Sequence, residues 1–197
     1  MSKARLEAFS DGVIAILITI MVLELKTPHG NDWHALIERE FAVGLLSYLL
    51  SFVYIAIYWN NHHHMLHASS RVNGTILWAN IHLLFWLSLV PFATRWMAET
   101  ADVHLQHIPT AAYGIVLLLN AIAYTILARA LVRQEGPQSK LARAMGRDFK
   151  GKVSLALYIA AIPLALFVRP QMSVAIYAIV AMIWFVPDRR VERVLAD

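Results

Sequence analysis

Asp11 is the residue of this sequence that most needs a partner. It lies near the start of the apolar run 9–25, directly after Ser10. An ionised carboxylate in apolar surroundings is destabilising, so we expect Asp11 to face protein or water and to accept hydrogen bonds from Ser, His, Trp or Asn side chains of other segments. The alternative is that Asp11 caps the start of a helix, where the helix dipole favours a negative charge.

A second polar cluster, which follows the apolar run 41–59, is rich in histidine. Its members are Trp59, His62, His63, His64 and His67. The spacings 63/67 and 64/67 could place two imidazoles on one helix face, where they could bind a metal. No cysteine or acidic residue lies nearby to complete a ligand set. We therefore predict no metal site, and expect one or two histidines to bond between helices while the others lie at the edge of the apolar phase.

The third apolar run, 76–97, contains Asn80 and His82 and ends close after Pro91. Polar side chains at such depth usually bond across helices, each contributing about 0.6–2 kcal/mol. Pro91 is expected to kink or end this helix, because proline lacks a backbone N–H. The sequence has no Gly-rich phosphate loop, nucleophile motif or paired carboxylates. We therefore expect that the protein is not an enzyme.

The composition requires an apolar environment around these residues. Of 197 residues, 59% are hydrophobic and 15% are charged, with a mean hydropathy of +0.56 and no cysteine. Soluble domains contain about 45–50% apolar and about 25% charged residues, so a soluble enzyme, a disordered chain and a disulfide-linked domain are all excluded. Six apolar runs approach the roughly 20 residues of a membrane span: 9–25, 41–59, 76–97, 109–131, 153–168 and 172–186. We predict an all-α integral membrane protein with six transmembrane helices in a single domain, 1–197.

The basic residues predict the orientation. On the N-terminal side of the expected bundle lie Lys3, Arg5, Arg71, Arg129, Arg133, Lys140, Arg143, Arg147, Lys150, Lys152, Arg189, Arg190 and Arg193. The opposite side has only Lys26, Arg39, Arg95 and Arg169. The thirteen basic residues on one side against four on the other predict a cell-membrane protein with both termini in the cytoplasm. The basic stretch 134–152 is expected to contact anionic lipid rather than nucleic acid, because no aromatic residues alternate with its charges.

Helical periodicity divides the first segment into two faces. At 100° per residue, one stripe is formed by Arg5, Phe9, Gly12, Ile16 and Leu23, with Thr19 and Ile20 on its shoulders. Ser10 and Asp11 point away from this stripe. After Arg5, the stripe is therefore apolar except for the hydroxyl group of Thr19.

These motifs resemble the TMEM175 (lysosomal potassium channel) family in its prokaryotic single-repeat form. The resemblance rests on Arg5-x-x-x-Phe9-Ser10-Asp11-Gly12 with Ile16 and Thr19, on Trp59-x-x-His62, and on Ala79-Asn80 followed by Leu89-Val90-Pro91-Phe92. It implies a homotetramer in the lipid bilayer, with a central pore lined by the first helix. It also implies a constriction at Ile16, further apolar layers at Ile20 and Leu23, and a polar lining at Thr19.

The same resemblance implies that Arg5, Ser10 and Asp11 join Trp59, His62 and Asn80 in a network that holds three helices together. The sequence has no T-V-G-Y-G-like carbonyl filter and no ladder of arginines for sensing voltage. We therefore expect a leak-type channel that needs no cofactor and passes potassium with weak selectivity. An ion-coupled secondary transporter, a metal- or proton-conducting protein and a non-conducting scaffold are the alternatives.

Overall fold

The computed structural model describes residues 2–28, 30, 32–100, 106–146 and 148–185, and every regular element in these ranges is a helix. The elements are α1 (Lys3–Leu23), the 3-10 helix η1 (Trp33–Leu36), α2 (Arg39–His67), α3 (Gly74–Ser88), α4 (Val90–Glu99), α5 (His107–Glu135), α6 (Lys140–Met145), α7 (Phe149–Phe167) and α8 (Pro170–Phe185). Arg147, Arg189, Arg190, Arg193 and the predicted segment end at 186 lie outside the described residues.

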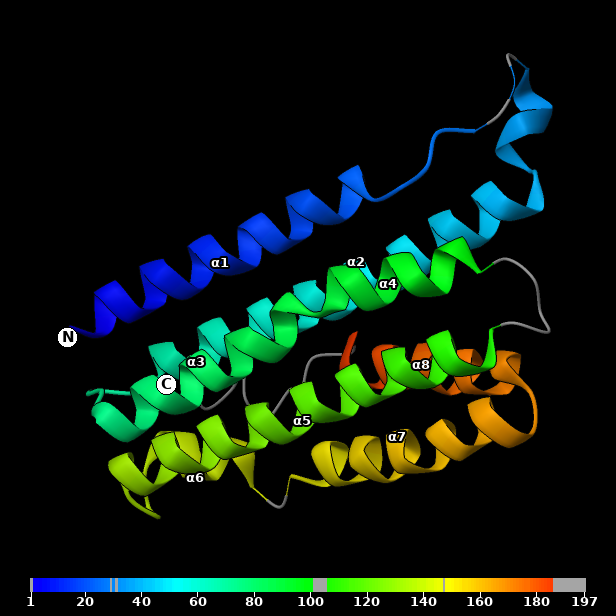
Figure 1. The fold of residues 1–197 in the computed structure, drawn as a ribbon. Coiled ribbons are helices and arrows are strands. Elements are labelled where there is room, and N and C mark those ends of the chain that lie inside the picture. The colour runs from blue at the N-terminus through cyan, green and yellow to red at the C-terminus, as the bar shows by residue number, and fades with distance from the viewer. Residues whose placement is uncertain (1, 29, 31, 101–105, 147, 186–197) are drawn as a thin grey trace.

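The long helices lie side by side along one direction (Figure 1). Among the described residues, five spans are long and apolar enough to cross a membrane when α3 and α4 are counted together, and the sixth predicted segment forms the shorter apolar helix α8. At one edge, α1 packs against α2 and α3, and α5 contacts α3, α4, α7 and α8. Hence α1 has one packed side and one open side.

Two boundaries differ from the sequence prediction. The second predicted segment, 41–59, lies inside α2, which continues beyond it to His67 as a 29-residue helix. Hydropathy falls after Trp59, but the backbone hydrogen bonds of the helix continue. The polar side chains of this last part require only that it lies outside the hydrocarbon. The third segment is divided at Leu89 into two helices, and Pro91 lies in the first turn of α4. The predicted effect of this proline is thus confirmed.

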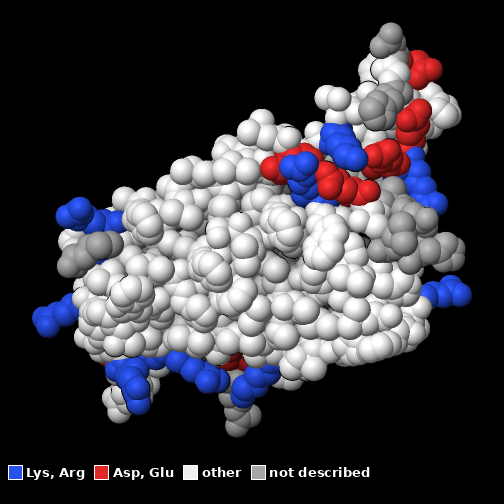
Figure 2. Space-filling model, viewed as in Figure 1, with Lys and Arg blue, Asp and Glu red and all other residues white. Residues whose placement is uncertain are grey.

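Charged side chains lie at the two ends of the bundle (Figure 2). At the end near the N-terminus, Lys3 Nζ donates to the His67 carbonyl and Glu135 accepts from the Ser70 backbone N–H. At the other end, Lys26 is paired with Glu40. The helices therefore cross the apolar band in alternating directions.

A buried group of tyrosines forms the core between α2, α5, α7 and α8. The Tyr54 hydroxyl donates to the Tyr177 carbonyl at 2.6 Å and accepts from the Tyr158 hydroxyl at 3.1 Å. Nearby, Ser51 bonds to the Tyr113 hydroxyl at 2.9 Å. These hydrogen bonds determine which of the apolar helices pack next to one another.

We expect Tyr54→Phe to lower the free energy of unfolding in detergent by about 0.5–1.5 kcal/mol, because the Tyr158 hydroxyl loses its acceptor. The measurement is chemical denaturation of the purified protein. Tyr48→Phe is the control, since Tyr48 is half-buried and contacts the Phe52 ring, and its hydroxyl makes no hydrogen bond to any described residue. Equal effects of the two substitutions would contradict a specific role for the Tyr54 hydroxyl.

Candidate functional site

The two faces of α1 have opposite surroundings. Leu6 and Ile14 are each 1% exposed and belong to the core, whereas Ile16 is 57% exposed and Leu23 is 80% exposed. The uncovered stripe contains Phe9, Gly12, Ile16, Thr19, Ile20 and Leu23. Figure 1 shows α1 at one edge of the bundle, and the exposure of these residues places the stripe on the open side of the helix. An exposed apolar stripe of this length needs either lipid or another protein surface to cover it.

Thr19 is the residue with a polar side chain in the uncovered stripe. Its hydroxyl donates back to the Ile16 carbonyl at 2.9 Å and lies 3.2 Å from the Ala15 carbonyl. The hydroxyl proton is therefore used within the helix. The oxygen lone pairs remain available on the open side, so this position can offer an acceptor but no competing donor.

A buried chain of hydrogen bonds fixes the opposite face of α1. Ser10 Oγ donates to the Leu6 carbonyl at 2.8 Å and accepts from Asn80 Nδ2 at 2.9 Å. Asn80 Oδ1 lies 2.7 Å from His62 Nε2. Because an amide oxygen can only accept, the His62 Nε2 atom must carry the proton. Side chains from α1, α2 and α3 are thereby joined in one satisfied network.

Asp11 makes a separate contact with α2. Its carboxylate accepts a hydrogen bond of 3.0 Å from the Trp59 indole N–H. The alternative reading of Asp11 as a helix cap is wrong, because α1 begins at Lys3 and its N-cap is Ser2. Asp11 instead lies inside the helix and fixes the rotation of α1 about its own axis relative to α2.

The structure does not join every residue of the expected network. Within the described part of the chain, Arg5 makes no hydrogen bond or ion pair, and its side chain is exposed. Phe9 is 54% exposed and belongs to the open stripe rather than to the packed face. His82 bonds locally, since its Nε2 atom accepts from the Trp86 indole at 2.8 Å.

His63 and His67 form a stack with Trp59 on the exposed side of α2, and His64 lies edge-on to His63. The rings of Trp59 and His63, and those of His63 and His67, are stacked with centroids 6.1 Å apart in each pair. Among the described residues, no group of three or more His, Cys, Asp or Glu side chains is placed to hold a metal ion.

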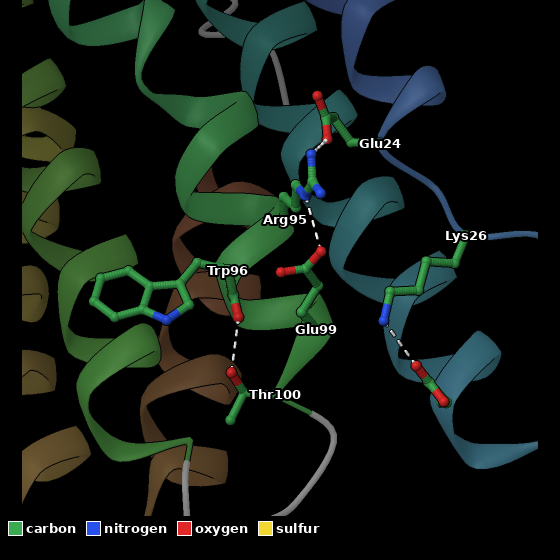
Figure 3. Close-up of polar contacts among 7 residues, drawn as sticks. Glu24, Lys26, Arg95, Trp96, Glu99 and Thr100 are labelled. Atoms are coloured by element: carbon green, nitrogen blue, oxygen red, sulfur yellow. Dashed lines mark hydrogen bonds and ion pairs between the residues drawn. The ribbon is translucent and has the colours of Figure 1, made fainter.

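An ionic contact at the opposite end of α1 was not anticipated from the sequence. Arg95 of α4 donates to Glu24 at 2.6 Å and to Glu99 at 2.9 Å (Figure 3). Lys26 pairs with Glu40 at 2.9 Å, and this hydrogen bond raises the pKa of Lys26 above its ordinary value. The last turn of α1, next to Leu23, is therefore tied to α2 and α4. Opposite charges at the ends of these segments were the only signal in the sequence.

We expect Asp11→Ala to lower the free energy of unfolding by about 1–2 kcal/mol, because the Trp59 indole N–H loses its acceptor. Asp11→Asn is the matched control, since it removes the charge and keeps an oxygen at the same place. Denaturation in detergent, followed by Trp fluorescence, measures both variants. If Asp11→Ala is as stable as the native protein, the contact does not position α1.

We also expect Arg95→Gln to lower the thermal midpoint at low salt, because two ion pairs are lost. The deficit should shrink near 1 M salt, where the Debye length is about 3 Å. Arg39→Gln is the control, as Arg39 makes no ion pair in the described ranges. A deficit that does not change with salt would show that Arg95 acts through packing instead.

Known proteins are similar to this chain in sequence. The family model "Endosomal/lysosomal potassium channel TMEM175" matches residues 5–91, a range that contains the whole stripe and the whole network. A potassium channel of Chryseobacterium sp. (strain P1-3) is 49% identical over 197 residues, covering 100% of both chains. A potassium channel of Streptomyces collinus is 35% identical over 130 residues, which are 64% of this chain and 62% of that protein.

More distant relatives are also similar to this chain, one of them in its solved structure. The endosomal/lysosomal proton channel TMEM175 of Gallus gallus is 28% identical over 171 residues, covering 80% of this chain and 34% of that protein. The crystal structure of a lysosomal potassium-selective channel TMEM175 homolog from Chamaesiphon minutus superposes with a TM-score of 0.75 at 28% identity, covering 93% of this chain and 96% of that one. The expected resemblance is thereby confirmed.

Proposed function

Because the chain belongs to the TMEM175 family, which is a family of membrane ion channels and not of enzymes, we propose that it is a potassium-permeable, weakly selective leak channel. In this proposal a homotetramer surrounds a central pore, and the four α1 helices line it. All six apolar segments of the single domain 1–197 cross the cell membrane, with both termini in the cytoplasm. Potassium is the permeant ion, and no cofactor takes part.

The uncovered stripe on α1 is the observation that carries this proposal. Ile16, Ile20 and Leu23 are 57%, 40% and 80% exposed, although the opposite face of the same helix is buried and hydrogen-bonded. Four copies that meet through this side would cover the stripe and leave a narrow axial passage. The Asn80 and Asp11 contacts would hold each copy of α1 in the rotation that presents these side chains to the axis.

Selectivity in this channel would come from dehydration at an apolar ring. From Lys3 to Leu23, α1 is a continuous α-helix, so its carbonyls bond within the helix and cannot replace the water around an ion. Ile16 would form the narrowest ring, with Ile20 and Leu23 as further layers and the Thr19 oxygen beside it. Potassium holds its water less tightly than sodium does, which gives a modest preference for potassium. Such a ring can also close by losing its water.

The direct test is electrical recording from purified protein in planar bilayers with unequal potassium on the two sides. A channel gives unitary current steps that reverse near the potassium potential, shifted toward zero by added sodium. Transport that saturates and depends on a proton or metal gradient would support a secondary transporter instead. A reversal potential that follows pH alone would assign the current to protons, as the name of the Gallus gallus relative suggests.

We expect Ile16→Asn to raise single-channel conductance several-fold and to reduce the preference for potassium over sodium, because an amide eases wetting of the ring. The control is Ile179→Asn. Ile179 lies on α8 and is 53% exposed, close to the 57% of Ile16, and the proposal places it away from the axis.

The absence of cysteine in the sequence allows a second test of the same position. A water-soluble thiol reagent should reduce the current of Ile16→Cys and leave that of Ile179→Cys unchanged. If Ile16→Asn and Ile16→Cys both behave like the native channel, the constriction lies elsewhere.

A further inference from the structure

A cavity separate from the stripe on α1 lies between α2, α5, α7 and α8. Its volume is about 40 Å³, and its aromatic walls include Tyr58, Tyr124, Tyr158 and Trp184. The start of α7 contributes Asp148 to the same cavity. None of these residues belongs to the proposed pore or to the network around Asn80. The inference drawn from this cavity is therefore independent of channel function.

The aromatic rings meet edge to face around the cavity. Tyr58 and Tyr124 are 6.0 Å apart at 68°, and Tyr124 and Trp184 are 6.3 Å apart at 76°. The Trp184 indole N–H is held by Ser154 Oγ at 2.8 Å, which fixes this ring in place. Rings in such an arrangement present π faces in several directions, and π faces attract cations.

Asp148 and Asn61 each supply the cavity with an oxygen atom that can accept a hydrogen bond. Asp148 accepts from the Gly151 backbone N–H through Oδ1, which leaves Oδ2 available. Asn61 uses its Nδ2 atom on the Ile57 carbonyl, so its Oδ1 atom remains an acceptor. The Tyr58 and Tyr124 hydroxyls make no hydrogen bond within the described residues. No Lys or Arg is among the described residues that line the cavity.

From this combination we propose that the cavity binds a primary ammonium group, carried by a phosphatidylethanolamine headgroup or by a small free amine. The carboxylate and the amide oxygen would accept the N–H bonds, and the aromatic rings would surround the adjacent methylene groups. At about 10–15 Å³ for each water-sized group, the cavity has room for about three non-hydrogen atoms, as in an aminoethyl group. A trimethylammonium group is bulkier and has no N–H to donate.

The test uses the full-length protein purified in detergent and incubated with equal amounts of phosphatidylethanolamine and phosphatidylcholine. Native mass spectrometry counts the retained lipids, and titration with ethylamine or choline, followed by Trp fluorescence, tests the free amines. We expect preferential retention of phosphatidylethanolamine if a lipid is the ligand, and saturable ethylamine binding if a free amine is. In either case choline should bind about tenfold more weakly.

Asp148→Asn is the decisive variant. Asn keeps an oxygen for the Gly151 N–H and tolerates the left-handed backbone of this residue, where φ is 43°. We expect about a tenfold loss of ammonium binding with an unchanged thermal midpoint. Asp32→Asn is the matched control, since Asp32 caps η1 by accepting from Ala35 N–H and lies outside the cavity. The proposal is overturned if Asp148→Asn binds as the native protein does, if choline binds as well as ethylamine, or if neither lipid nor amine is retained.

Discussion

The two buried hydrogen bonds of Asn80, which donates to Ser10 and accepts from His62, determine which face of α1 stays open. An apolar helix in a bilayer gains little from the hydrophobic effect when it rotates, because lipid and protein are similarly apolar. Polar contacts must therefore set its rotation. Ser10 is completely buried, so turning α1 would leave Asn80 without its partner in a medium that cannot supply water. The apolar stripe is thus defined by the polar contacts on the opposite side.

The packing of the rest of the bundle supports this arrangement of α1. Tyr54 bonds to Tyr158 and to the Tyr177 carbonyl, so that α2, α7 and α8 form a second core away from α1. α2 belongs to both parts, since His62 faces the first network and Tyr54 faces the second. A rigid α2 therefore transmits the position of the outer helices to α1.

Sequence reasoning succeeded where a single segment contained the whole signal. The period of 3.6 residues separated Ile16 from Ser10, and hydropathy located the apolar segments. It failed for contacts between distant segments. The pair of Glu24 and Arg95 is 71 residues apart, and no local pattern connects the two. The partners of Asp11 came from resemblance to a family and not from spacing. Hydropathy alone did not locate the end of α2 at His67, because hydropathy falls at Trp59, before the helix ends.

The contacts at the two ends of α1 also limit how a pore lined by this helix could open. Ser10 and Glu24 are attachment points near the two ends of α1, and the 14 residue steps from one to the other correspond to about 21 Å of helix. Ile16 lies between these points, within one unbroken helix. Local unfolding at Ile16 would break backbone bonds that lipid cannot replace. In the proposed pore, the apolar ring would therefore change either by tilting of the whole helix or by the entry and loss of water, and only the second would leave both attachments intact.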